Sequence, residues 1–208
     1  MKKFYVLCLG LLLATSSVFA QSVSLDYTKK DKSLVDESHT TVGLSVSTAA
    51  PAGFRVGVRV EDEMVDTTVA CQSRHGNCQT TTKNQEGLVQ INANRDVLTK
   101  TVLALPVTLY GDVAVGYKSK NAQSGFKYYA GSVGVKTTVG NVRVNVAERL
   151  RSPFNEGSLG TGSKYRTYET SVGAAVDLSK KNAAFVKYAD ERGDIKSHSL
   201  GFGVTHSF

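Results

Sequence analysis

The last thirteen residues of the chain, KSHSLGFGVTHSF at positions 196–208, give the first indication of the fold. Leu200, Phe202 and Val204 share one parity with the terminal Phe208, and small or polar residues occupy most of the alternate positions. Successive side chains of a β-strand point to opposite faces, so this alternation predicts a strand with one apolar face. A soluble sandwich also contains such strands, so the tail alone leaves the architecture open.

The first twenty residues have the pattern of a secretory signal peptide. Lys2 and Lys3 precede an apolar core at residues 4–14, and Ala20 ends a small-residue cleavage site. We expect one mature domain of residues 21–208, whose formal net charge falls from +7 to +5 because two lysines are removed. This mild, scattered basicity in a secreted chain argues against nucleic-acid binding. The apolar core is too short to span a bilayer and no later run is long enough, so a mature chain in a membrane must be a barrel.

Segments of alternating hydrophobicity recur along the mature chain. In residues 54–61 the apolar positions alternate with ones that include Arg55, Arg59 and Glu61. Charge on every second residue does not fit a soluble core, but it fits a barrel wall with lipid outside and water inside. The apolar faces are centred on residues 23–27, 42–46, 54–60, 89–93, 109–117, 129–135, 142–146, 172–176, 184–188 and 200–208. The pattern therefore predicts about ten strands, with eight or twelve if residues 95–106 are misread.

The connections between these segments alternate between long and short, as expected for a barrel with loops at one end and turns at the other. The predicted loops are residues 29–39, 62–86, 118–125, 152–165 and 191–196, and the predicted turns are 49–53, 96–106, 139–141 and 178–182. An even number of strands places both termini at the turn end.

Two further stretches complete the pattern: LYGDVAVGY at 109–117, after a proline-containing turn, and the closing GFGVTHSF at 201–208. Together with the signal and the alternation, they resemble the small outer-membrane β-barrel proteins of Gram-negative bacteria. Phe202, Val204 and Phe208 resemble the C-terminal assembly signal of such proteins. The resemblance spans the mature chain and implies an all-β, transmembrane, up-and-down antiparallel barrel with its termini in the periplasm. It also implies contact with outer-membrane lipids, including lipopolysaccharide, and with the barrel-assembly machinery. The absence of Trp departs from the pattern and leaves Tyr and Phe for the interfacial girdle.

Parity directs a nearly balanced set of charged side chains into the lumen. The main members are Arg55, Arg59, Glu61, Asp112, Lys136, Arg143, Arg149, Glu169, Asp177 and Lys187, joined by Asp26, Lys118 and Glu191. These groups either form ion pairs that fill and rigidify the interior, or line a narrow wet passage whose arginines bind small anions. The sequence therefore predicts a narrow porin-like passage for small solutes. The alternative is a non-conducting barrel with a structural or surface-interaction role.

Glu148 has the opposite parity and is expected to face lipid. It lies either at the headgroup level near Leu150 or beside a β-bulge that shifts the register.

Cys71 and Cys78 are the cysteines that remain after processing. The secreted context predicts a disulfide between them at the tip of the longest loop. His75 lies between the two, but three ligands in an oxidising compartment favour the bridge over a metal site. We predict no metal and no cofactor.

Basic residues gather where the loops begin, either to solvate the loop bases or to pair with lipopolysaccharide phosphates. They are Lys29, Lys30, Lys32, Lys118, Lys120, Lys127, Lys164, Arg166 and Lys196. Arg192-Gly193-Asp194 matches a tripeptide that integrins recognise, but glycine and aspartate are also ordinary hairpin-turn residues, which is the interpretation we favour.

The chain lacks the residue spacings that known barrel enzymes use. Barrel proteases carry Asp-x-His and barrel deacylases carry His-x-Ser, and neither occurs here. The nearest match is His198 between two serines, with Glu191 or Asp194 as the carboxylate partner that a general base needs. We therefore predict a monomer with no enzymatic activity.

Overall fold

The computed structural model describes residues 21–32, 37–73, 76–120, 123–154 and 165–208, with side chains for all of these but 32, 69–80, 120, 123 and 124. The predicted signal peptide at 1–20, His75 and Lys164 therefore lie outside the described residues. Within these ranges, no helix is long and apolar enough to cross a membrane.

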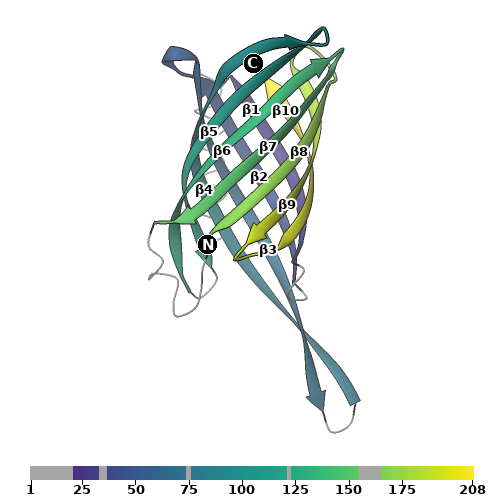
Figure 1. Ribbon diagram of the computed structural model, residues 1–208. Helices are drawn as coiled ribbons and strands as arrows, with labels where there is room; N and C mark the ends of the chain where they lie inside the picture. The colour runs from purple at the N-terminus through teal and green to yellow at the C-terminus, as the bar shows by residue number, and fades with distance from the viewer. Residues whose placement is uncertain (1–20, 33–36, 74–75, 121–122, 155–164) are drawn as a thin grey trace.

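Ten antiparallel strands close into a barrel, which confirms the predicted fold and strand count (Figure 1). Each strand pairs with its neighbours in sequence, and the ring closes where β1 pairs with β10, from Ser22 opposite Ser207 to Lys32 opposite Ser197. The strands are β1 Ser22–Lys32, β2 Glu37–Ala49, β3 Phe54–Ser73, β4 Gly76–Val102, β5 Leu105–Lys120, β6 Gln123–Val139, β7 Val142–Pro153, β8 Thr167–Asp177, β9 Asn182–Gly193 and β10 Ser197–Ser207. One 3₁₀ turn, η1 Pro51–Gly53, joins β2 to β3.

The alternation in the sequence separates the outside of the barrel from its inside. Leu25, Phe202 and Val204 are 51%, 57% and 53% exposed on the outer surface, whereas Asp26, next to Leu25, is 5% exposed and faces inward. The wall is one strand thick, so parity alone decides the environment of a side chain. An apolar exterior and a charged interior follow directly from the pattern.

Residues 95–106, the ambiguous stretch of the sequence, form the end of β4, a two-residue turn and the start of β5. A register shift beside Asp96 marks a β-bulge in β4. Leu103 and Ala104 form the turn, and both have positive φ, at 50° and 66°. Such angles match the twist of a tight hairpin. Pro106 lies next to this turn at the start of β5, where a proline is tolerated in a sheet.

The predicted loop at residues 62–86 is instead a continuation of β3 and β4. The two strands stay paired as far as Ser73 opposite Gly76, and this hairpin projects beyond the barrel in Figure 1. Hydrophobic alternation reports burial rather than strand formation, so polar β-branched residues in the projection form a strand without that pattern. Cys71 lies directly opposite Cys78. Residues in this position on antiparallel strands have Cα atoms about 4.5–5.5 Å apart. A disulfide can span that distance. Their side chains lie outside the described set, so the disulfide stays a prediction.

The connections sort to two ends of the barrel. Odd-numbered strands end at the barrel end with the projecting hairpin, the loop end, and even-numbered strands end at the opposite one, the turn end. Strand also replaces much of the predicted loops at 29–39 and 118–125, so the contrast in length is smaller than expected. The turn at Gly140 is confirmed, with a φ of 61°. Gln21 and Phe208 meet at the turn end, where the Phe208 N–H donates to the Gln21 carbonyl at 3.2 Å.

Candidate functional site: the polar lumen

Within the part of the chain that the structure describes, three cavities follow one another along the inside of the barrel. The cavity toward the loop end has a volume of about 380 Å³, the middle one about 470 Å³ and the one at the turn end about 820 Å³. The first two share Arg149, Glu169 and Lys187 as lining residues, and the last two share Arg55 and Arg143. Charged side chains therefore form the boundaries between successive cavities.

The residues predicted to line the lumen all lie on the walls of these cavities. They are Arg55, Arg59, Glu61, Asp112, Lys136, Arg143, Arg149, Glu169, Asp177 and Lys187. Parity alone predicted their direction, and the structure adds their partners.

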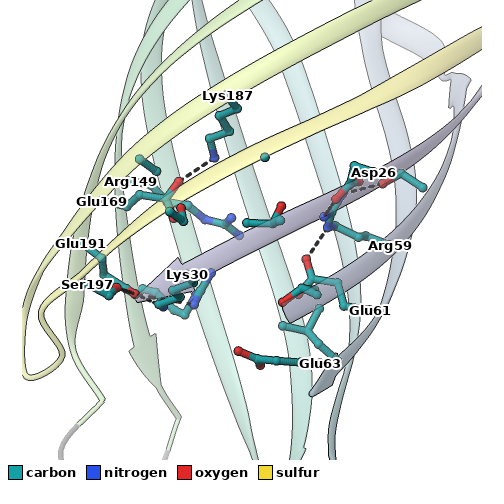
Figure 2. A pocket seen from close by; sticks show the side chains of 18 of the residues that line it. Asp26, Lys30, Arg59, Glu61, Glu63, Arg149, Glu169, Lys187, Glu191 and Ser197 are labelled. Atoms are coloured by element: carbon teal, nitrogen blue, oxygen red, sulfur yellow. Dashed lines mark hydrogen bonds and ion pairs between the residues drawn. The ribbon is translucent and has the colours of Figure 1, made fainter. Parts of the chain in front are cut away.

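Arg59 on β3 is held by two carboxylates in the loop-end cavity (Figure 2). Its two terminal nitrogens each donate to Asp26 on β1 at 2.7 Å, and its Nε donates to Glu61. Between these strands, Gly43 of β2 leaves the space that the pair occupies, because a Cβ there would lie 2.5 Å from Arg59 Nη2. The charge of Arg59 is thus neutralised against the wall.

Arg149 on β7 has a different environment. Its Nη2 donates to the Gln90 side-chain oxygen on β4 at 2.7 Å, and Gln90 also accepts the Tyr128 hydroxyl at 3.0 Å. This contact crosses the lumen between strands that are not neighbours. Among the described residues Arg149 forms no ion pair, and its Nε has no hydrogen-bond partner. The carboxylate of Glu169, which lines the same cavity, is bound instead by Lys187 at 2.7 Å.

Two further ion-pair clusters lie near the loop end. In the first, Lys118 Nζ lies 2.7 Å from Glu63 and 3.0 Å from Glu86, and His39 Nδ1 lies 2.6 Å from Glu63. The pairs span strands β2 to β5 on one side of the lumen.

In the second cluster, Glu191 on β9 binds Lys30 of β1 and accepts the Ser197 hydroxyl at 3.0 Å (Figure 2). Arg151 of β7 approaches the same carboxylate at 3.8 Å.

A small apolar and aromatic cluster narrows the loop end beside these charges. Its buried members include Phe126, Tyr165 and Leu88, and the rings of Phe126 and Tyr165 meet edge to face with centroids 4.3 Å apart. Tyr165 lies outside the strands. Burial acts to raise the pKa of its phenol, but the positive charges of Lys118 and Arg151 outweigh burial and place the pKa below its usual range.

At the turn end the ion pairs are more exposed to solvent. Arg143 pairs with Asp177 at 2.7 Å, and Lys136 pairs with Asp96 at 2.6 Å. Arg55, which lines both neighbouring cavities, has no ion pair among the described residues.

The sequence analysis missed several lumen residues because it assigned their segments to loops. Lys30 was expected only among the basic residues of the outer rim, whereas Lys118 was expected both there and in the lumen; both face inward and bind glutamates. His39 and Glu63 were overlooked for the same reason. They could have been found by continuing the alternation of inward and outward side chains along β2 and β3 beyond the apolar residues of these strands.

Two surface motifs are explained by local structure. Gly193 has a φ of 113°, and the Asp194 carboxylate accepts the Arg166 backbone N–H at 2.7 Å, which is the turn chemistry favoured for this tripeptide. His198 lies on the outer wall and its Nδ1 is 3.0 Å from Asp190. Of the two carboxylates considered as its partner, Glu191 faces the lumen and Asp194 accepts the Arg166 backbone N–H.

The described residues contain no group of three His, Cys, Asp or Glu side chains placed to hold a metal ion. The lumen contacts are ion pairs and hydrogen bonds to amides and hydroxyls.

Comparison with known proteins identifies the architecture. No family model and no curated protein matches the chain. Among solved structures, an outer-membrane channel from Pseudomonas putida F1 has a TM-score of 0.55 at 10% identity, covering 91% of this chain and 96% of that one. The transport unit of the autotransporter AIDA-I from Escherichia coli gives 0.52 at 10%, covering 91% and 90%. The β-domain of the Bordetella autotransporter Brka gives 0.51 at 11%, covering 91% and 99%. The resemblance predicted from the sequence is thus confirmed at the level of fold, and the chain has the fold of outer-membrane β-barrels.

Proposed function

We propose that this chain is an integral outer-membrane barrel that passes small anionic solutes through a narrow polar lumen. The observation that carries the proposal is the series of adjoining cavities in which Arg149 and Arg55 form no ion pair with any carboxylate of the described residues. The other two candidate arginines, Arg59 and Arg143, are neutralised by Asp26 and Asp177. A guanidinium with free donors in a wet lumen offers a fork to an anion.

The outer wall supports a membrane location. A belt of half-exposed apolar side chains surrounds the barrel, and it includes Val89, Ile91, Val113, Val115, Val133, Val146, Val172, Val186, Leu200 and Phe202. Tyr27, Tyr117, Tyr129 and Tyr168 stand on this outer face and are 37%, 44%, 42% and 49% exposed. In water such a surface would drive aggregation, whereas lipid covers it.

The orientation follows from the same reasoning. Phe208 is 59% exposed beside the turn end, where an assembly signal of the outer-membrane type is read. We place the turn end and both termini of the mature chain in the periplasm, with the loop end outside the cell. Its partners are then the barrel-assembly machinery and outer-membrane lipids, including lipopolysaccharide.

Conductance of the purified protein in a planar lipid bilayer tests the function. The native chain should give small unitary steps, and under a potassium chloride gradient its reversal potential should favour chloride. Arg149→Gln removes the unpaired guanidinium and should shift the reversal potential toward that of an unselective pore. Arg95→Gln is the matched control, because Arg95 faces outward and contacts the Phe54 ring instead of the lumen.

Silent bilayers at ample incorporation would contradict the proposal, and equal shifts for both variants would contradict the role of Arg149.

A second candidate function is supported by the projecting hairpin. The β2–β3 pairing ends at Thr67, and the β4–β5 pairing begins at Gly87, so β3 beyond Thr67 and β4 before Gly87 have no strand on their outer edges among the described residues. Open edges bind extended peptides by strand addition. A non-conducting barrel that presents this hairpin to other surfaces is therefore the alternative. A variant with residues 68–81 replaced by a two-residue turn should keep its conductance under the first function, and should lose cell-surface adhesion under the second.

A further inference from the structure

A band of polar side chains crosses the outer wall over β7 to β10. We call it the outer polar seam, and its members are Glu148, Thr170, Asp190, Arg192 and His198. Thr170 donates to Glu148, and Arg192 donates to Thr170 while its Nη2 lies 3.8 Å from Glu148 Oε1. Arg192 Nε lies 3.5 Å from Asp190, whose other oxygen faces His198 Nδ1 at 3.0 Å. The seam therefore connects four adjacent strands.

The seam reaches into the apolar belt. Strand β7 pairs with β6 and with β8 without a register shift, so a bulge at Glu148 is excluded. Val146 and Leu150 flank Glu148 on the same face and are 41% and 38% exposed, and Tyr168 lies opposite Leu150. Apolar residues thus stand on both sides of this carboxylate along the strand, as they do where a barrel meets lipid chains.

Contacts within the chain leave the seam incompletely satisfied. The Glu148 and Arg192 side chains are 56% and 59% exposed, and their separation of 3.8 Å exceeds a hydrogen bond. A guanidinium has five donors, of which Arg192 directs few to its own chain. Lipid tails offer no hydrogen bonds, so charges on this face are costly in a membrane unless another surface covers them.

We propose that the outer polar seam is the contact surface for a second copy of this chain, in a side-by-side dimer with its two-fold axis along the membrane normal. The inference rests on the membrane location proposed above and departs from the monomer expected from the sequence. Because the seam carries both signs of charge, two-fold symmetry places Arg192 of each copy against Glu148 of the other.

Charge and shape favour a second copy over lipid. Lipopolysaccharide phosphates would be repelled by Glu148 and Asp190. Gly131, opposite Leu150, has nothing within 4 Å of where a Cβ would stand, which leaves a flat area beside the seam for close packing.

A charge-swap experiment tests the dimer. Donor- and acceptor-labelled copies of the mature chain are reconstituted in vesicles of phosphatidylethanolamine and phosphatidylglycerol, and association is measured by energy transfer. Glu148→Arg and Arg192→Glu should each weaken self-association about tenfold or more, since like charges then face each other across the interface. Mixing the two variants should restore association, because each contact between copies then joins opposite charges. Within each variant the 148–192 pair stays like-charged, so recovery cannot come from contacts inside one chain.

Asp62→Arg is the matched control, an outward carboxylate on β3 that binds Gln85 away from the seam. It should leave association unchanged. A native chain that stays monomeric, single variants that associate normally, or a mixture that fails to recover would each overturn the proposal. The seam lies outside the lumen, so all variants keep native conductance, and failure of the dimer is distinguishable from failure of the passage.

Discussion

Substitution of Asp26 by alanine should destabilise the barrel far more than the same change at Asp177. Both carboxylates bind an arginine at 2.7 Å, but the Asp26 side chain is 4% exposed and that of Asp177 is 46% exposed. Removal of one partner from a buried pair leaves a desolvated charge and costs about 3–5 kcal/mol. Arg59 keeps Glu61, so we expect a loss near the lower limit, about 3 kcal/mol, for Asp26→Ala. An exposed pair contributes about 0–1 kcal/mol, so Asp177→Ala should cost less than about 1 kcal/mol.

Urea unfolding of the lipid-reconstituted protein, followed by far-ultraviolet circular dichroism, measures the free energy of unfolding by linear extrapolation. Asp26→Asn provides a graded step, because the amide keeps one acceptor for Arg59 and should lose part of the stability only. Similar losses for Asp26→Ala and Asp177→Ala would refute the claim that burial in the lumen sets the strength of these pairs.

Three further outcomes follow from the structure. Gly43→Val places a side chain where the Arg59–Asp26 ion pair lies and should lower the midpoint of urea unfolding. Gly131→Val projects into open space and should leave the midpoint nearly unchanged. Equal midpoints for the two variants would contradict the packing described around Gly43. Deletion of Phe208 should leave secretion intact but slow membrane assembly, and normal heat-modifiable electrophoretic migration of that variant would count against the assembly role. Cys71 and Cys78 should yield no free thiol in unreduced protein, and two titratable thiols would rule out the bridge.

The strands within the apolar belt were predictable because an apolar outer face and a polar inner face impose a strict two-residue period on them. That constraint ends where the belt ends. Lys30 belongs to a run of charged residues that reads as a loop, yet it continues β1 and faces Glu191. Beyond the belt, both faces of a strand are polar and the sequence carries no periodic signal.

The partners inside the lumen could not be predicted, although the direction of the side chains could. Parity directs Arg149 inward, but its contact with Gln90 joins β7 to β4 across the ring. Such a contact depends on the stagger accumulated over all the strands. A single sequence fixes the register of neighbouring strands through their turns. It does not reveal which residues of more distant strands lie at the same height in the barrel.

Ring closure has a kinetic consequence for biogenesis. The Ser24 and Thr205 hydroxyls are 2.8 Å apart and separated by 181 residues, so the first strand to emerge must wait for the last. Contacts of such sequence separation form slowly, and until they form, the edges of β1 and β10 remain open to other chains. A chain whose last strand has not yet paired therefore exposes two strand edges, and the pairing of β10 with β1 sets how long they stay exposed.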